Sequence, residues 1–186
     1  TGDVLALANY PTFDPNRPGD APAEHRLNQS VASILEPGST FKPFVFAEAL
    51  EQGLIDLQTP IHCEGGAWRM SNGRVLNDAH GYGVLSAAMV LVKRSNIGMA
   101  KIAALLGERT LYQTVRAYGF GSPTGASVIG EQAGLVHPLS RWTSYSMGSV
   151  PMGQEIAVTP MQLATAYCAL ANGGVLMRPR IVQTVR

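Results

Sequence analysis

The spacing of apolar positions along the chain predicts a fold built mainly from helices. In residues 39–52 the apolar side chains, among them Phe41 and Val45, fall on one face of a helix, and Gly53 ends that helix. This face is expected to pack inward. Further helical or apolar stretches are predicted over residues 86–92, 97–106, 109–118 and 159–171.

The helix over residues 159–171 has the strongest local signals. Thr159 is placed as its N-cap, Pro160 takes the first position and Gln162 the third, so that Thr159 and Gln162 form a capping box. The Asn-Gly-Gly run at 172–174 then ends the helix.

Strands are predicted near the two ends of the chain. Residues 3–9 and 175–185 are apolar and extended in character, and residues 60–84 predict loop or short strands. Residues 11–22 and 121–158 contain many glycine, proline and serine residues and are expected to form loops.

Composition then narrows the class of protein. The chain has 186 residues, of which 46% are hydrophobic and 15% charged, so a disordered chain is excluded. Fourteen Lys and Arg against thirteen Asp and Glu leave a net charge of +1, which argues against nucleic acid as a partner. Cys63, Cys168 and the four histidines match no metal-ligand spacing, and no metal or other cofactor is predicted.

A serine and a lysine one helical turn apart carry the candidate chemistry. Ser39 and Lys42 are spaced i, i+3 and share one helix face, and the turn Pro37-Gly38 places Ser39 at the helix N-terminus. A serine hydroxyl becomes a good nucleophile when a base removes its proton, and a lysine serves as that base when part of it is neutral. The pair alone is a weak signal, but the surrounding run Pro-Gly-Ser-Thr-Phe-Lys-Pro-Phe strengthens it.

This run resembles the Ser-x-x-Lys motif of the penicillin-binding protein transpeptidases, and within them the class B group of division and elongation enzymes. The resemblance extends from residues 1–16, similar to the family's first strand and loop, to residues 153–174, similar to its late core helix. It implies an α/β (α+β) fold of the β-lactamase/transpeptidase type, rich in helix and incomplete at its C-terminus. It also implies that Ser39 is acylated and that Lys42 activates it.

The family's second motif, Ser-x-Asn, is matched in part. Asn96 fits the asparagine that contacts the substrate amide, but Arg94 stands where the serine is expected. Arginine stays charged and cannot relay a proton. The neighbouring Ser95 is the remaining candidate substrate contact, whereas Asp78 and His80 are expected to be structural.

The family's third motif, Lys-Ser/Thr-Gly, is absent from the sequence. The resemblance therefore implies that residues 1–186 form a partial transpeptidase domain that lacks this strand region. Such a piece is expected to be weakly active or inactive, because oxyanion-stabilising donors supply much of the rate of acyl transfer.

By the same resemblance, the protein cross-links peptidoglycan stem peptides ending in D-Ala-D-Ala and is a target of β-lactams. Division or elongation proteins are its expected partners. It is expected at the extracytoplasmic face of the cytoplasmic membrane, anchored by a segment outside this sequence. Two alternatives stay open: a non-catalytic β-lactam sensor or scaffold, which Arg94 would favour, and a class D-like β-lactamase.

Overall fold

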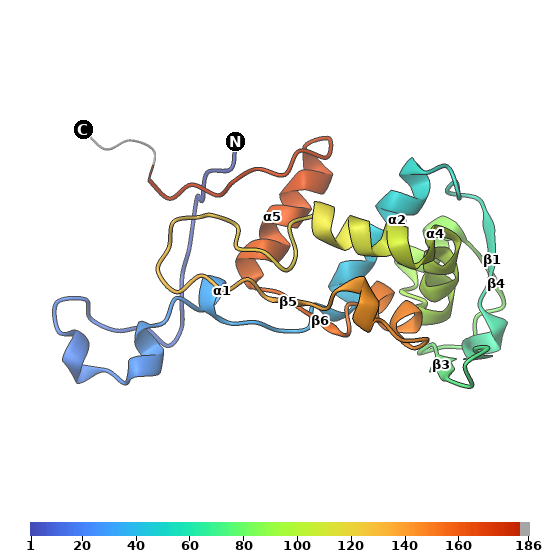
Figure 1. Ribbon diagram of the computed structural model, residues 1–186, viewed down its shortest axis with the longest axis horizontal. Coiled ribbons are helices and arrows are strands. Elements are labelled where there is room, and N and C mark those ends of the chain that lie inside the picture. Colours follow the sequence, from blue (N-terminus) through green and yellow to red (C-terminus); the bar gives the residue numbers. More distant parts are fainter. Residues whose placement is uncertain (183–186) are drawn as a thin grey trace. The chain divides into compact units, whose positions relative to one another are not determined.

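A computed structural model describes residues 1–182 of the chain, which fall into two compact units (Figure 1). Unit 1 combines Thr1–Leu35, Gly119–Leu135 and the chain from Ala157 onward. Unit 2 combines Glu36–Tyr118 and Val136–Ile156, and it contains all the candidate site residues. Among the described residues, no helix has the length and apolar character needed to cross a membrane.

Unit 2 is a group of helices with two small antiparallel strand pairs. Strand β1 pairs with β4, and β2 pairs with β3. The elements are the 3-10 turn η3 (Gly38–Phe41), α2 (Lys42–Glu51), β1 (Pro60–His62), β2 (Ala67–Arg69), β3 (Val75–Asn77), β4 (Val84–Ser86), α3 (Ala87–Val92) and α4 (Asn96–Ala117). Short 3-10 turns follow at Glu64–Gly66, Leu139–Arg141, Ser146–Gly148 and Val150–Met152.

Helix α2 packs along α4 and forms the core of unit 2 (Figure 1). Phe41, Phe44 and Val45 are fully buried, and the Phe44 ring lies 4.8 Å from that of Tyr118. This burial confirms the inward-packing face predicted for residues 39–52. It also holds Lys42, at the start of the helix, inside the unit.

Two of the predicted helices in the middle of the chain join at a kink. Helix α4 runs from Asn96 to Ala117, but Gly107 within it has φ of +75°, so the backbone is not helical there. Because a residue with a side chain is strained in this conformation, glycine is favoured at the kink. The predicted break between residues 97–106 and 109–118 is confirmed, and the predicted stretch 86–92 forms α3 with Ser86 as its N-cap.

Unit 1 contains α1 (Gln29–Ala32), α5 (Pro160–Ala171) and the 3-10 turns Pro18–Asp20 and Ala23–Arg26. The capping box of α5 is present, as predicted, with Thr159 accepting from the Gln162 amide. The buried Gln162 side chain also donates to the carbonyls of Ser122 and Ala133. One side chain therefore both starts α5 and ties two loop segments to it.

The strands predicted near the chain ends do not form regular strands in the described residues. Residues 3–9 contribute one bridge, in which Asp3 pairs in parallel with Arg180. Residues 175–182 form no strand beyond that bridge, and residues 183–185 of the prediction lie outside the described part. A strand requires a continuous ladder of backbone hydrogen bonds, and these segments share only two such bonds. A third short pair joins β5 (Leu135–Val136) and β6 (Ile156–Ala157).

Candidate active site

Ser39 lies in the tight turn η3 that leads into α2. Its residue is half-buried, and among the described residues its hydroxyl has no hydrogen-bond partner. The carbonyl of Ser39 accepts from the Lys42 amide, which places the two residues on consecutive turns of one helical segment. The hydroxyl is thus held by the backbone and left free for chemistry.

A neighbouring loop supports this turn. The Gly38 amide donates to the Gly153 carbonyl at 3.0 Å, and the Glu155 amide donates to the Glu36 carboxylate at 3.0 Å. A Cβ on Gly153 would lie 2.2 Å from the Gly38 carbonyl oxygen. The backbones therefore approach more closely than any side chain at 153 would allow, and the position of Ser39 depends on this approach.

The Lys42 side chain is fully buried and bound at its end by two oxygens. Its Nζ donates to the Arg94 carbonyl at 2.6 Å and to Asn96 Oδ1 at 2.7 Å. Burial lowers the pKa of Lys42 from 10.5 to about 8, with Asp78 acting to raise it and Arg94 to lower it further. An appreciable fraction of Lys42 is therefore neutral at pH values near neutrality.

The two acceptors suit a lysine that acts as a base. A neutral amine has two N–H bonds and one lone pair, and the oxygens of Arg94 and Asn96 accept both N–H bonds. Neither partner donates a hydrogen bond to the lone pair, so the lone pair can accept a proton. Among the described residues, no hydrogen bond joins the Ser39 hydroxyl to Lys42 Nζ, and in proteins without substrate such catalytic contacts are often long.

Asn96 is half-buried at the first position of α4, and both ends of its side-chain amide have defined partners. Its Nδ2 donates to the Asn77 carbonyl at 3.0 Å, which leaves Oδ1 facing Lys42. Among the described residues, the second N–H of Nδ2 has no hydrogen-bond partner. Asn96 and Lys42 therefore belong to one hydrogen-bonded cluster of side chains.

Ser95 faces a different environment. It is buried, its hydroxyl caps α4 by accepting from the Gly98 amide at 2.9 Å, and it donates to Asp78 Oδ2 at 2.5 Å. These bonds assign the hydroxyl to the helix cap. The substrate contact expected of Ser95 stays a prediction that this geometry does not favour.

Arg94 contributes its backbone carbonyl, and not its side chain, to the hydrogen bonds of Lys42. Its side chain is exposed, its φ is +58°, and its carbonyl is the oxygen that binds Lys42. Sequence reasoning considered only the missing serine hydroxyl at this position and missed the carbonyl. Nothing in the sequence indicates this contact, because it depends on a left-handed backbone that arginine rarely adopts.

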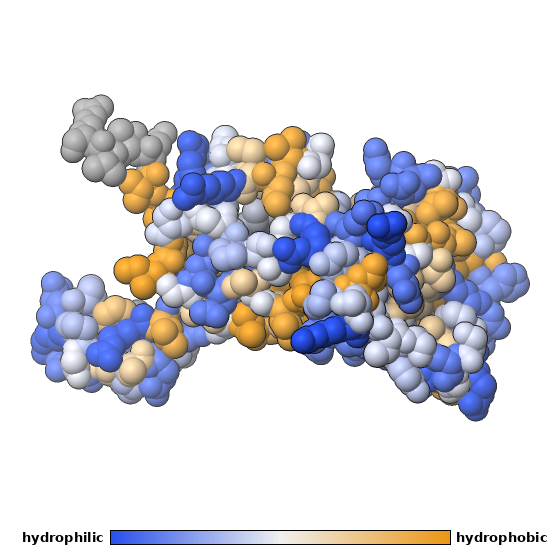
Figure 2. Space-filling model, in the orientation of Figure 1, coloured by the Kyte–Doolittle hydropathy of each residue, from blue (hydrophilic) through white to orange (hydrophobic). Residues whose placement is uncertain are grey.

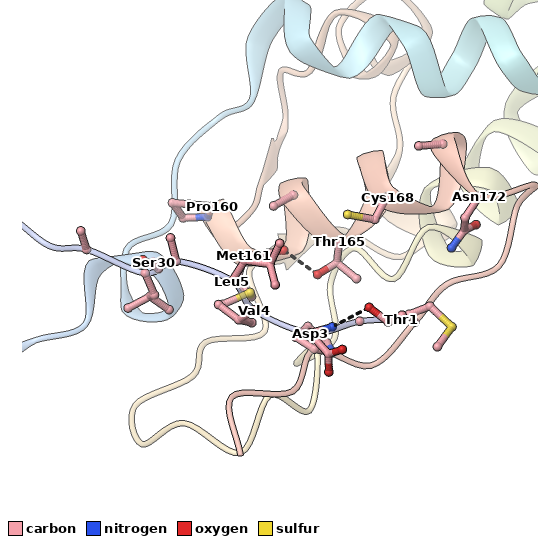
Figure 3. Close-up of a pocket in the computed structure, with 18 residues that line it drawn as sticks. Thr1, Asp3, Val4, Leu5, Ser30, Pro160, Met161, Thr165, Cys168 and Asn172 are labelled. Carbon is pink, nitrogen blue, oxygen red and sulfur yellow. Dashed lines mark hydrogen bonds between the residues drawn. The ribbon is translucent and has the colours of Figure 1, made fainter. Parts of the chain in front are cut away.

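A separate cavity in unit 1 holds no such group of residues. It has a volume of about 710 Å³ and lies between the N-terminal segment and α5 (Figure 3). Thr165 in its wall bonds back to its own helix at the Met161 carbonyl, and Cys168 lies in the same wall. The hydrogen bonds of the buried Lys42 and its place one turn after Ser39, rather than cavity size, therefore identify the candidate active site. Within residues 1–182, no three His, Cys, Asp or Glu side chains gather as a metal ion requires.

Comparison with known sequences points to one family. Residues 1–186 match the family model described as the penicillin binding protein transpeptidase domain. The chain is 37% identical over 177 residues to the probable peptidoglycan D,D-transpeptidase PenA of Neisseria gonorrhoeae, covering 95% of the chain and 30% of that protein. It is 33% identical over 175 residues to the peptidoglycan D,D-transpeptidase FtsI of Escherichia coli K12, covering 94% of the chain and 29% of that protein. The chain thus spans under a third of the length of these relatives.

Comparison with solved structures agrees. The transpeptidase domain of penicillin-binding protein 3 from Burkholderia pseudomallei superimposes with a TM-score of 0.87 at 30% identity, covering 100% of this chain and 51% of that one. Penicillin-binding protein 3 of Mycobacterium tuberculosis in complex with ampicillin gives 0.81 at 32% identity, covering 92% of this chain and 37% of that one. The mixed fold, rich in helix, that the sequence predicts is therefore confirmed.

Proposed function

The chain belongs to the penicillin-binding protein transpeptidase family, and from this membership we propose that the protein is a peptidoglycan D,D-transpeptidase acting through a Ser39 acyl-enzyme. The observation that carries the proposal is the buried Lys42, of lowered pKa, one turn after an unbonded serine hydroxyl. Asn96 completes the group as the contact for the substrate amide.

In the first step, neutral Lys42 takes the proton of the Ser39 hydroxyl while Oγ attacks the carbonyl carbon of the penultimate D-alanine. The tetrahedral intermediate collapses, the C–N bond to the terminal D-alanine breaks, and the proton passes to the leaving amine. The backbone amides at the start of the helix favour the negative charge that develops in this step.

In the second step, the amine of another stem peptide attacks the ester carbonyl of the acyl-enzyme. Lys42 takes a proton from that amine and returns one to Ser39 Oγ as the ester bond breaks. The product is a new amide cross-link, and the enzyme is regenerated with both residues in their starting protonation states.

A β-lactam follows the first step only. Ser39 Oγ attacks the lactam carbonyl, the ring C–N bond opens, and the leaving nitrogen stays tethered to the acyl group. The related Mycobacterium tuberculosis protein is described in complex with ampicillin. Together with the family membership, this supports β-lactams as ligands of this protein.

The proposed substrate also sets the location. Stem peptides are cross-linked at the extracytoplasmic face of the cytoplasmic membrane, and we place the protein there, held by an anchor outside residues 1–186. Division or elongation proteins are the proposed partners, in keeping with the relative named FtsI.

Incubation with benzylpenicillin, followed by intact mass and peptide mapping, tests the nucleophile. One adduct on the peptide containing Ser39 is expected in the wild-type chain and in Ser144→Ala, which removes an exposed hydroxyl in the same unit. Ser39→Ala is expected to form none. An adduct on another residue would contradict the assignment of Ser39.

Arg94 supports one second candidate, a β-lactam sensor or scaffold that is acylated without turnover. A peptide ending in D-Ala-D-Ala, supplied with an amine acceptor, separates the two functions. Release of D-alanine with formation of a new amide supports the transpeptidase. Stable acylation by penicillin, with no release of D-alanine from the peptide, would support the sensor if Arg94→Ser restores that release. Hydrolysis of a chromogenic cephalosporin would instead indicate a β-lactamase, which no relative named above supports.

A further inference from the structure

The carboxylate of Asp78 accepts three hydrogen bonds at the start of α4. Its Oδ1 accepts from the backbone amides of Asn96 at 2.5 Å and Ile97 at 3.0 Å. Its Oδ2 accepts from the Ser95 hydroxyl at 2.5 Å. Asp78 directly follows β3, so the bonds join a loop to a helix that begins 18 residues later in the sequence.

The same short segment also holds the side chain of Asn96. The carbonyl of Asn77, the last residue of β3, accepts from Asn96 Nδ2, while Asn96 Oδ1 accepts from Lys42 Nζ. Asn77 and Asp78 therefore hold the side-chain amide and the backbone of Asn96 respectively. The orientation of Asn96 toward Lys42 depends on both.

We infer that Asp78 is a positioning residue for acylation, which holds Asn96 against Lys42 by accepting the amides of Asn96 and Ile97 and the hydroxyl of Ser95. The inference rests on the proposed function. Asp78 touches neither substrate nor Ser39 in this role; it acts through Asn96 and through its charge.

The charge of Asp78 also supports the inference, because it affects the pKa of Lys42, the proposed base. Asp78 raises the pKa of Lys42, against the larger lowering caused by burial. The Arg94 guanidinium acts in the opposite direction and lowers that pKa, and the Cys63 Sγ lies 3.4 Å from the Ser95 Oγ. Lys101 is paired with Glu64. Removal of the Asp78 charge therefore leaves Lys42 with a pKa below about 8.

Two substitutions separate the effect of the Asp78 charge from the effect of its side-chain length. Asp78→Asn keeps the shape and removes the charge, whereas Asp78→Glu keeps the charge and displaces it by one methylene. The first readout is the rate of Ser39 acylation by benzylpenicillin between pH 6 and pH 10 (roughly two units either side of the Lys42 pKa). The second is NMR titration of ¹³C-labelled lysine side chains, which is tractable because the sequence has only three lysines.

In Asp78→Asn, the Lys42 titration and the acid limb of the rate profile are expected to move to lower pH. The plateau rate is expected to fall roughly 100-fold, as for other small displacements of catalytic groups. Asp78→Glu is expected to keep the titration near that of the wild type and still lose rate. A role in folding alone would lower stability and rate without moving the Lys42 titration, and that outcome would overturn the inference.

Asp56→Asn is the matched control. Asp56 also accepts from a backbone amide and a hydroxyl, those of Gln58 and Thr59, within the same unit. Its replacement is expected to leave both readouts unchanged. If the wild-type chain is not acylated at all, the proposed function fails for this chain. The lysine titration then still decides the inference, and an unchanged Lys42 titration in Asp78→Asn overturns it.

Discussion

At the scale of single residues, Lys42 is the side chain whose environment departs most from the ordinary. A lysine in water carries its charge up to a pKa of 10.5, but the buried Lys42 has a pKa of about 8. Its two acceptors, the Arg94 carbonyl and Asn96 Oδ1, compensate part of the loss of water. The residue can thus lose its proton near neutral pH and still be anchored when neutral.

The pH dependence of acylation follows from this pKa. The neutral amine is the active form, so the rate of Ser39 acylation by benzylpenicillin is expected to rise about tenfold per pH unit below pH 8 and then level off. Lys42→Arg, which stays protonated, is expected to lose at least roughly 100-fold at all pH values. The exposed Lys93→Arg is the control and is expected to keep the wild-type profile. A rate in Lys42→Arg close to that of the wild type would exclude Lys42 as the base.

Only part of this site could be predicted from the sequence. The proximity of Ser39 and Lys42 follows from their i, i+3 spacing, which any helix enforces. The contact of Lys42 with Asn96 spans 54 positions and was not predicted, because the resemblance to a family indicated Asn96 only as a contact for the substrate amide. The Arg94 carbonyl was not foreseen, because a backbone oxygen has no signature in the residue letters.

At the scale of elements, the turn η3 and the loop after Met152 act as one support for Ser39. Gly38 and Gly153 approach so closely that a single added carbon would meet backbone atoms of Gly38 at 2.2 and 2.6 Å. Backbone cannot move aside as a flexible side chain can. The turn that presents the nucleophile is therefore fixed by an element more than 100 residues away in the sequence.

Gly153→Ala is expected to displace the η3 turn. Strain from the φ of +72° adds to the clash, so a loss of about 1–3 kcal/mol in the free energy of unfolding is expected, together with slower acylation of Ser39. Urea unfolding and penicillin acylation measure the two effects. Gly73→Ala is the matched control, because Gly73 has φ of +84° in the same unit but no atom within 4 Å of an added Cβ. Equal effects of the two substitutions would show that strain alone, and not the approach to Gly38, matters at position 153.

Helices were predicted better than strands for a physical reason. The capping signals of Ser86, Thr159 and Gln162 act within three or four residues, so a single sequence reveals them. Residues 3–9 have the composition of a strand, but a strand also needs a hydrogen-bonded neighbour, and the described chain supplies one bridge. Local composition could not predict that outcome.

At the scale of the whole molecule, the chain divides into two units, each of which has both buried and exposed apolar side chains. Unit 2 buries Phe41, Phe44 and Phe46 at α2, which packs along α4. In unit 1, Leu5 is 95% exposed, and Val175 and Ile181 are at least half exposed. On the face shown in Figure 2, apolar surface is interrupted by hydrophilic groups.

The two cysteines report on the two units separately. Cys168 is exposed on α5 in unit 1, beside the cavity of Figure 3, whereas Cys63 is fully buried in unit 2. A thiol-reactive reagent is expected to label Cys168 within minutes in native buffer and Cys63 only when unit 2 unfolds, since labelling needs an accessible thiolate. Mass spectrometry of labelled peptides across a urea gradient measures both. Cys168→Ser is the control and should leave native protein unlabelled, and rapid labelling of Cys63 in native buffer would contradict the buried core of unit 2.

The backbone contact between Arg94 and Lys42 has a consequence for how this gene tolerates mutation. A hydrogen bond to a main-chain carbonyl survives any codon change that leaves the peptide path intact. Natural selection can therefore replace the side chain at position 94 while the lysine keeps its anchor. A change of side chain at position 94 therefore does not by itself remove this anchor of Lys42.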